Sequence, residues 1–196
     1  MVLASSNAGK LRELTALLAP LDFELIPQGA LGVTAPHETG DTFRENAMLK
    51  ARYASALTTL PALADDSGIE VDFLGGRPGV FSARYAGEHA TDRDNLDRML
   101  QELEPAAPPE RTARYRCVIV FLRHGTDPAP VIAEGSWEGS ILRQPRGAGG
   151  FGYDPIFLPA GLDRSAAELS PEQKNALSHR GAALSRLLAR LVAERS

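Results

Sequence analysis

The chain has only three lysines, and each lies in a polar segment rich in helix-capping residues. They are Lys10, Lys50 and Lys174, while the other 18 of the 21 basic residues are arginines. An ammonium is a compact point charge that suits phosphate oxygens, whereas a guanidinium is a planar fork that suits bidentate partners. The lysines are therefore candidate phosphate ligands, although an arginine-rich composition also leaves a few lysines by chance.

The first of these segments joins an apolar stretch to a helical pattern, and it reads Ser5-Ser6-Asn7-Ala8-Gly9-Lys10. It is not a P-loop, because Ala4 stands at the leading glycine of that motif and Leu11 at its closing Ser/Thr. A turn between a strand and a helix presents free backbone N–H groups to an anion. The alternative is that Ser6 or Asn7 only caps the helix.

Glu38, Glu45 and the adjacent pair Asp65-Asp66 form an acidic set. We expect the pair to lie in a turn after an apolar strand, where mutual repulsion calls for a nearby cation. Mg²⁺ takes hard oxygen ligands and bridges substrate phosphates, so it would supply that charge. One aspartate would otherwise serve as general base on a water molecule. The alternatives are a capping-box role for Glu45 and an Asx-turn for the aspartates.

Two later segments carry groups suited to a flat heterocycle. Residues 147–155 are dense in glycine and include Phe151, which suits stacking on a base, and Tyr153, which we expect to fill the core. His179 and Arg180 begin the last helical pattern. A guanidinium has only donors, so it suits a 6-oxo purine better than the amino group of adenine. The alternative is decoration of a helix start, although cations oppose the helix dipole there.

Strand and helix signals alternate along the chain, which is typical of an α/β protein with a mixed sheet. Apolar runs predict strands over residues 2–4, 60–64, 69–71, 114–122 and 131–141, the last two as a hairpin. Periodicity and capping residues predict helices that begin near Asn7, Thr42, Thr91, Ser170 and Ser178. Pro20 is expected to stop the first helix, and residues 104–110 are expected to form a surface loop.

Size and composition predict one globular domain over residues 1–196, with 43% hydrophobic and 23% charged residues. The net charge of −4 argues against broad binding of nucleic acid or of an anionic membrane. No apolar run approaches a membrane span, and the first residues lack a basic signal-peptide region, so we expect a cytoplasmic protein. Cys117 lies alone in an apolar run and is expected to pack in the core.

Six motifs together resemble the inosine/xanthosine triphosphate pyrophosphatase (Ham1-like) family over nearly the whole chain, and linked motifs are far more specific than any single one. In chain order they read SSNAGK, ETGDTFRENAMLKA, ADDSGIEV, GRPGVFSARYAG, GGFGYDPIF and ELSPEQKNALSHRG. The resemblance implies an elongated two-lobed α/β domain around a central mixed β-sheet flanked by helices, and a homodimer. It also implies hydrolysis of the non-canonical purine nucleotides ITP, dITP and XTP to monophosphate and pyrophosphate, which cleanses the nucleotide pool.

The resemblance further implies roles for residues at matching positions. Those implied for the triphosphate are Ser5, Ser6, Asn7, Ala8, Gly9, Lys10, Lys50 and Lys174. Glu38 and Asp66 would hold Mg²⁺, with Asp65 as a further candidate ligand, and Asp66 would also be the base that activates water. The family's usual Thr-Gly-Asn start reads Ser-Ser-Asn here, so a hydroxyl is kept but the glycine that permits close backbone approach is absent.

The remaining implied roles concern the substrate's base and the reaction. Ser67 would contact the substrate, and the residues implied for the base pocket are Phe151, Gly152, Tyr153, Asp154, His179 and Arg180. Water would attack the α-phosphorus with pyrophosphate as the leaving group. Three other functions remain open: a nucleotide sensor without catalysis, a related pyrophosphatase that prefers modified pyrimidines, and a general phosphatase that releases orthophosphate.

Overall fold

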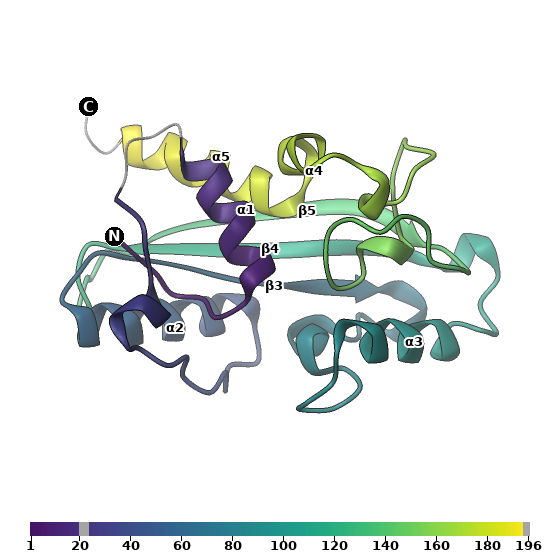
Figure 1. The fold of residues 1–196 in the computed structure, drawn as a ribbon, viewed down its shortest axis with the longest axis horizontal. Coiled ribbons are helices and arrows are strands. Elements are labelled where there is room, and N and C mark those ends of the chain that lie inside the picture. Colours follow the sequence, from purple (N-terminus) through teal and green to yellow (C-terminus); the bar gives the residue numbers. More distant parts are fainter. Residues whose placement is uncertain (20–23, 194–196) are drawn as a thin grey trace. The chain divides into compact units, whose positions relative to one another are not determined.

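The computed structural model describes residues 1–19 and 24–193, and its contacts divide the chain into two compact units. Unit 1 draws on Met1–Asp66, Cys117–Gly135 and Arg180–Ser196, and unit 2 on Ser67–Arg116 and Ser136–His179. Each unit is therefore assembled from segments far apart in the sequence. Figure 1 follows the chain from purple to yellow.

The strands form one mixed sheet in the order β2-β1-β3-β4-β5-β6. Their bounds are β1 Val2–Leu3, β2 Ile26–Pro27, β3 Ala62–Val71, β4 Thr112–Leu122, β5 Val131–Ile141 and β6 Phe157–Pro159. Strand β1 pairs in parallel with β2 and β3, whereas β5 and β6 are antiparallel. The α/β class with a mixed sheet is thus confirmed, as are the two long strands that follow each other as β4 and β5.

Three helices cover the strands of unit 1, namely α1 (Ala8–Leu18), α2 (Phe43–Thr58) and α5 (His179–Ala193). Figure 1 shows α1 and α5 on one side of these strands and α2 on the other. Helices α1 and α5 pack their leucines on the sheet, in a core of Leu3, Leu14, Leu18, Leu63, Cys117, Ile119, Val131, Ala133, Ala183, Leu184 and Leu187. Small alanines line the buried stripe of α2, so this helix lies close against its neighbours.

The helix starts of unit 1 follow the predicted capping residues. Asn7 caps α1 by accepting the N–H of Lys10, and Thr42 with Glu45 forms a complete capping box at α2. Helix α1 ends at Leu18, and Pro20, which was expected to stop it, lies outside the described residues. Short polar side chains thus place the starts of α1 and α2.

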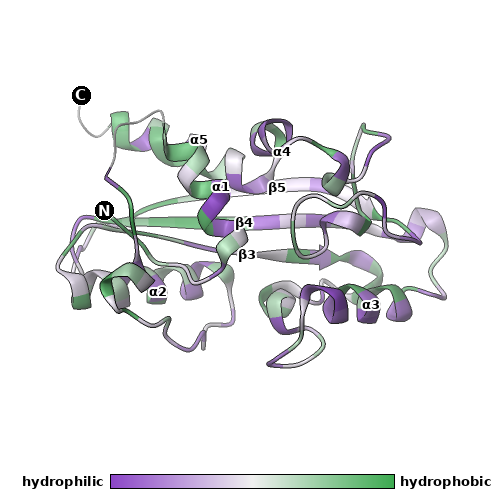
Figure 2. Cartoon of the chain, viewed as in Figure 1, coloured by the Kyte–Doolittle hydropathy of each residue, from purple (hydrophilic) through white to green (hydrophobic). Residues whose placement is uncertain are grey.

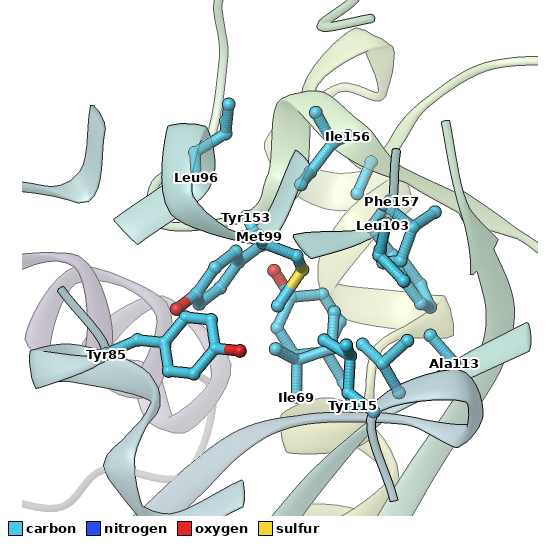
Figure 3. Close-up of a cluster of buried hydrophobic side chains, with 14 of the residues drawn as sticks. Ile69, Tyr85, Leu96, Met99, Leu103, Ala113, Tyr115, Tyr153, Ile156 and Phe157 are labelled. Carbon is cyan, nitrogen blue, oxygen red and sulfur yellow. The ribbon is translucent and has the colours of Figure 1, made fainter. Parts of the chain in front are cut away.

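Unit 2 contains α3 (Asp92–Glu102) and α4 (Pro171–Leu177), both begun by the capping residues that the sequence predicted. Its core gathers aromatic and aliphatic side chains from α3, β3, β4, β5 and the segment before β6 (Figure 3). Tyr115 of β4 meets Phe157 edge to face, with ring centroids 4.7 Å apart. Such pairs add to the stabilisation from buried area.

Short 3₁₀ turns complete the two units, and they are Gln28–Leu31, Asp72–Leu74, Gly79–Arg84, Pro108–Glu110, Asp154–Ile156 and Ala166–Glu168. One of them falls in the predicted surface loop 104–110, where Ala106 is nevertheless fully buried. No helix in residues 1–19 and 24–193 is long and apolar enough to cross a membrane.

Strand β4 changes character along its length, as Figure 2 shows by its colour, from hydrophilic near its start to hydrophobic toward its end. Cys117 lies in the apolar part and is 1% exposed. Burial raises the pKa of its thiol to about 12, so the thiolate is suppressed at neutral pH. The prediction that this cysteine packs in the core is confirmed.

The predicted turn at residues 65–68 is wrong, because β3 continues without a break from Ala62 to Val71. Asp65 and Asp66 are 1% and 4% exposed, within the strand itself. Carboxylates are rare in buried strands since they need compensation. Here basic side chains from three helices supply it, which a local reading of the sequence could not anticipate.

Gly68 in the same strand marks a close approach of backbone rather than a turn. A Cβ atom there would lie 2.4 Å from the carbonyl oxygen of Gly79 and from Oγ of Ser82. The Ser82 hydroxyl instead accepts the N–H of Ile69 at 2.9 Å. The glycine therefore serves packing inside unit 2.

Candidate active site

Unit 1 holds a group of seven ionised side chains, four of them buried and three partly buried, which we call the charged cluster: Lys10, Glu13, Glu38, Lys50, Asp65, Asp66 and Arg180. Its first part centres on Lys50 of α2. The Lys50 ammonium lies 2.6 Å from Oε1 of Glu38 and 2.7 Å from Oδ1 of Asp66. One lysine therefore joins the loop before α2 to the middle of β3.

The second part of the charged cluster centres on Asp65. Its Oδ2 accepts hydrogen bonds from Nη2 and Nε of Arg180 at 3.1 and 3.3 Å, and Lys10 Nζ lies 3.4 Å away. Arg180 also bonds the carboxylate of Glu13 on α1. Arg180 is 1% exposed, so these ion pairs are shielded from solvent.

The two adjacent aspartates experience opposite electrostatic environments. Burial alone would raise the pKa of Asp65, but the nearby charges of Lys10, Arg180 and Lys50 outweigh it and lower that pKa far below its usual value. Burial also raises the pKa of Asp66, and Lys50 and Lys10 offset this only in part. Asp65 is thus a fixed anion, and Asp66 has the greater affinity for a proton.

Lys50 remains an ammonium in spite of its burial. Desolvation lowers the pKa of Lys50, but the carboxylates of Asp66, Glu38 and Asp65 together raise it above the ordinary value. A permanently charged Lys50 suits contact with phosphate oxygens.

The charged cluster contains four carboxylates and three basic groups, and Asp66 is the carboxylate suited to a further cation. Oδ2 of Asp66 is buried and has no hydrogen-bond partner among the described residues. No three His, Cys, Asp or Glu side chains in that part of the chain group together as a metal site. Mg²⁺ is commonly held by only one or two carboxylates plus substrate phosphates, so Glu38 and Asp66 fit it as a pair.

The predicted segment 5–10 lies at the N-terminus of α1, where helix amides are available to an anion. Ser5 is buried and its Oγ accepts the N–H of Asn7 at 3.3 Å. Gly9 is buried, while Ser6, Asn7 and Ala8 are exposed. The segment therefore presents backbone and side-chain donors to solvent, with Asn7 also serving as the cap.

Unit 2 holds a second group, the aromatic cluster: Tyr115, Phe151, Asp154, Lys174 and His179. Asp154 is 2% exposed and accepts the N–H of Phe151 at 2.9 Å and the hydroxyl of Tyr115 at 3.2 Å. Lys174 forms an ion pair with the same carboxylate, and its ammonium lies 4.6 Å from the centre of the Phe151 ring. Asp154 thus fixes both the glycine-rich loop and Lys174.

His179 stacks on Tyr115 within this cluster, with ring centroids 4.6 Å apart and planes 7° from parallel. Tyr153 is 4% exposed, and its hydroxyl donates to the carbonyl oxygen of Ser82, which confirms its core role. Gly152 donates its N–H to Asp92 at 2.7 Å. One carboxylate from the loop itself, Asp154, and one from the start of α3, Asp92, therefore hold consecutive amides of the glycine-rich loop.

The structure distributes the predicted residues between the clusters in a way that the motifs did not show. Lys174, expected beside a triphosphate, pairs with Asp154 in the aromatic cluster. Arg180, expected beside a purine base, pairs with Asp65 and Glu13 in the charged cluster. Ser67 is half-buried in β3. All of the predicted site residues lie in the described part of the chain.

Sequence reasoning missed Glu13, Asn46 and Tyr115. Glu13 and Asn46 looked like ordinary polar positions of two helices, yet Asn46 is fully buried. Tyr115 alternates with Ala113 and Cys117, which are also buried, so the period of the strand could have placed it inside. Its contact with His179 had no local signal.

Comparisons with known proteins agree with this architecture. The sequence model of the Ham1 family matches residues 1–190. A dITP/XTP pyrophosphatase of Methylococcus capsulatus is 58% identical over 191 residues, which cover 97% of this chain and 95% of that protein. The dITP/XTP pyrophosphatase of Escherichia coli strain K12 is 53% identical over 188 residues, covering 96% of this chain and 95% of that protein.

Solved structures show the same fold at high sequence identity. A HAM1 protein from Coxiella burnetii has a TM-score of 0.89 and 51% identity, and the Staphylococcus aureus Ham1 protein has a TM-score of 0.85 and 39% identity. Each match covers 98% of both chains. This chain belongs to the Ham1 family.

Proposed function

We propose that the protein is a nucleoside-triphosphate pyrophosphatase that hydrolyses ITP, dITP and XTP to the monophosphate and pyrophosphate. The observation that carries this proposal is the charged cluster. There Lys50 joins the carboxylates of Glu38 and Asp66, and Oδ2 of Asp66 is buried without a hydrogen-bond partner among the described residues. The relatives named dITP/XTP pyrophosphatase, at more than half identity over nearly the full chain, support the same reaction.

In this proposal Glu38 and Asp66 hold Mg²⁺, with Asp65 beside them as a fixed anion. Bound Mg²⁺ would neutralise charge on the phosphates as a Lewis acid. Lys10 and Lys50 bind phosphate oxygens, and the N-terminus of α1 adds backbone donors. These groups are held in place before substrate arrives, so they stabilise developing charge without reorganising.

Asp66 acts as the general base toward the attacking water. Its raised pKa favours uptake of a proton compared with Asp65. Water attacks the α-phosphorus, the bond from that phosphorus to the bridging oxygen breaks, and pyrophosphate leaves with the bonding electrons. The proton from water passes to the Asp66 carboxylate.

The aromatic cluster recognises the base in this proposal. Phe151 offers a face for stacking, and Asp154 holds it through its backbone N–H. Discrimination against adenine is assigned to donors of the glycine-rich loop and to His179, because donors meet the 6-oxo group of hypoxanthine or xanthine but oppose the amino group of adenine.

We further propose that the chain works as one functional domain over residues 1–196 and as a homodimer in the cytoplasm, where free nucleotides are found. The net charge of −4 supports small nucleotides rather than nucleic acid as the partner. Light scattering of the purified protein would give twice the 21.0 kDa chain mass if it is a dimer.

The function is tested by measuring pyrophosphate and orthophosphate separately over a panel of ITP, XTP, dITP, GTP, ATP and UTP with Mg²⁺. We expect pyrophosphate from ITP, XTP and dITP, with much slower turnover of ATP and UTP. Release of orthophosphate would identify a phosphatase instead. Tight binding of ITP without any turnover would identify a sensor.

A further inference from the structure

Asn46 on α2 is fully buried and binds both backbone groups of a single residue, Gly40. The N–H of Gly40 donates to Oδ1 of Asn46 at 2.8 Å, and Nδ2 of Asn46 donates to the carbonyl oxygen of Gly40 at 3.3 Å. A side-chain amide that pairs in this way fixes the position and the orientation of the backbone. The loop before α2 is therefore anchored at Gly40.

Gly40 fits this anchor because it has no side chain. A Cβ atom there would lie 2.6 Å from Cβ of Glu45 and 2.8 Å from Oδ1 of Asn46. The next two amides, of Asp41 and Thr42, donate to Oε2 of Glu45 at 2.9 and 3.1 Å. Three consecutive residues are thus tied to the first turn of α2.

Glu38 lies two residues before this anchor, and its carboxylate binds Lys50 at 2.6 Å. Lys50 follows Asn46 by one helical turn on α2. The same helix therefore holds the Glu38 segment at two points: its backbone through Asn46 and its carboxylate through Lys50. Neither contact alone would fix a glutamate on an otherwise irregular loop, since its side chain has several free torsions.

We propose that Asn46 is a positioning residue that sets the metal ligand Glu38 through the backbone of Gly40. This inference rests on the proposed function, because that function makes Glu38 a metal ligand. Asn46 does not touch the metal or the substrate in this proposal. It restricts the loop so that the Glu38 carboxylate is in place beside Lys50 before the metal binds.

The test compares Asn46→Ala with Ser55→Ala. Ser55 is a matched control because it is also a buried polar residue of α2, 1% exposed, and its hydroxyl donates to the carbonyl oxygen of Leu60 at 2.7 Å. Both variants lose a buried hydrogen bond to backbone, and thermal unfolding measures what each loses in stability. Only Asn46→Ala releases Gly40.

Three further quantities are measured on each protein. They are Mn²⁺ binding to the substrate-free protein by electron paramagnetic resonance, amide hydrogen exchange at Gly40 and Asp41 without metal, and the Mg²⁺ concentration for half-maximal turnover of ITP. We expect Asn46→Ala to weaken Mn²⁺ binding about 10- to 100-fold, to raise the Mg²⁺ requirement in parallel and to speed exchange at Gly40. Ser55→Ala should leave all three quantities within about twofold of the wild type, because in the described part of the chain the Ser55 hydroxyl bonds to Leu60 and not to the loop that carries Glu38.

Gly40→Ala disrupts the same contact from the loop side. The proposal can therefore still be tested if Asn46→Ala folds poorly. Because both changes break one contact, the double variant should bind Mn²⁺ about as weakly as either single variant. Wild-type Mn²⁺ affinity in Asn46→Ala and Gly40→Ala would overturn the proposal, and so would an equal loss in Ser55→Ala. If the wild type releases no pyrophosphate, the proposed function fails, and Mn²⁺ binding and amide exchange still decide the role of Asn46.

Discussion

The charged cluster and the aromatic cluster differ in how completely their charges are balanced. In the charged cluster four carboxylates face three basic groups, and Oδ2 of Asp66 lacks a hydrogen-bond partner among the described residues. In the aromatic cluster one carboxylate, Asp154, faces one ammonium, Lys174, and the remaining groups are aromatic rings. The first cluster is suited to bind a cation with phosphates, and the second offers a flat surface and a fixed loop.

The same difference appears inside the charged cluster between the adjacent aspartates. Oδ2 of Asp65 pairs with both Arg180 and Lys10, so its charge holds parts of the fold together. Among the described residues Asp66 forms an ion pair with Lys50 alone, which it shares with Glu38, so it keeps capacity for a proton or a metal. Of these two adjacent residues, Asp65 therefore has a structural role, and Asp66 is available for the reaction.

The largest effect should come from Asp66→Asn. Removing the base should lower kcat for ITP about 10²- to 10⁴-fold, the range that general bases contribute. The amide can still accept from Lys50, so the midpoint of thermal unfolding should change little. A variant with near-normal kcat would contradict the assignment of Asp66 as the base.

Asp65→Asn should show the opposite pattern, with a large loss of stability. It leaves Arg180 and Lys10 without their buried anion, and breaking such pairs from one side costs about 3–5 kcal/mol. Urea unfolding of both aspartate variants at neutral pH measures this difference. Equal stability of the two variants would remove the distinction between the aspartates.

The stabilisation by Asp65 also has a predicted pH dependence. The folded-state pKa of Asp65 is depressed by Lys10, Arg180 and Lys50 against the effect of burial. Its contribution is therefore present above the unfolded-state pKa near 4 and is lost as the pH falls through the folded-state value. The stability gap between wild type and Asp65→Asn should accordingly shrink below about pH 4, as followed by urea unfolding from pH 7 downward.

Phe151→Ala tests the aromatic cluster, and we expect an effect of intermediate size on KM. Loss of stacking is worth about 1–3 kcal/mol per base, so KM for ITP should rise about 10- to 100-fold while Mg²⁺ dependence stays the same. Phe81→Ala is a matched control because that ring is 56% exposed and lies on a separate turn, Gly79–Arg84. A similar KM in both variants would show that Phe151 does not contact the base.

The smallest expected effect is that of Asp92→Ala. Its carboxylate accepts the N–H of Gly152 at 2.7 Å, but Asp92 is exposed, so the bond contributes about 1 kcal/mol or less. We expect up to about a fivefold rise in KM for ITP and a reduced preference over ATP. Asp97→Ala is the control, because Asp97 pairs with Arg93 on the helix surface and forms no bond to the loop in the described part of the chain. An effect of Asp97→Ala as large as that of Asp92→Ala would exclude a role of the Gly152 contact.

The sequence predicted those features of the fold that depend on local chemistry. Capping residues such as Asn7 and Thr42 placed helix starts, and the apolar runs placed β4 and β5, because each signal acts over a few residues. It failed at β3, where the pair Asp65-Asp66 looked like a turn. Their compensation comes from Lys10, Lys50 and Arg180, which only the fold brings to the strand.

The candidate site shows the same limit. Residue types alone pointed to the three lysines and to an acidic set of Glu38, Glu45, Asp65 and Asp66, since ammonium groups and carboxylates are the usual partners of phosphate and Mg²⁺. The family resemblance then selected Glu38 and Asp66. The pairing of Arg180 with Asp65 joins residues 115 positions apart and has no local signal. Glu13, Asn46 and Tyr115 were missed for this reason, because their roles arise from contacts across the fold.

The measurement that tests the proposed reaction most directly is hydrolysis of ITP in water enriched with ¹⁸O, followed by mass spectrometry of both products. Attack of water on the α-phosphorus predicts one ¹⁸O atom in the inosine monophosphate and none in the pyrophosphate. Label in the pyrophosphate would place the attack on the β-phosphorus and contradict the proposed reaction.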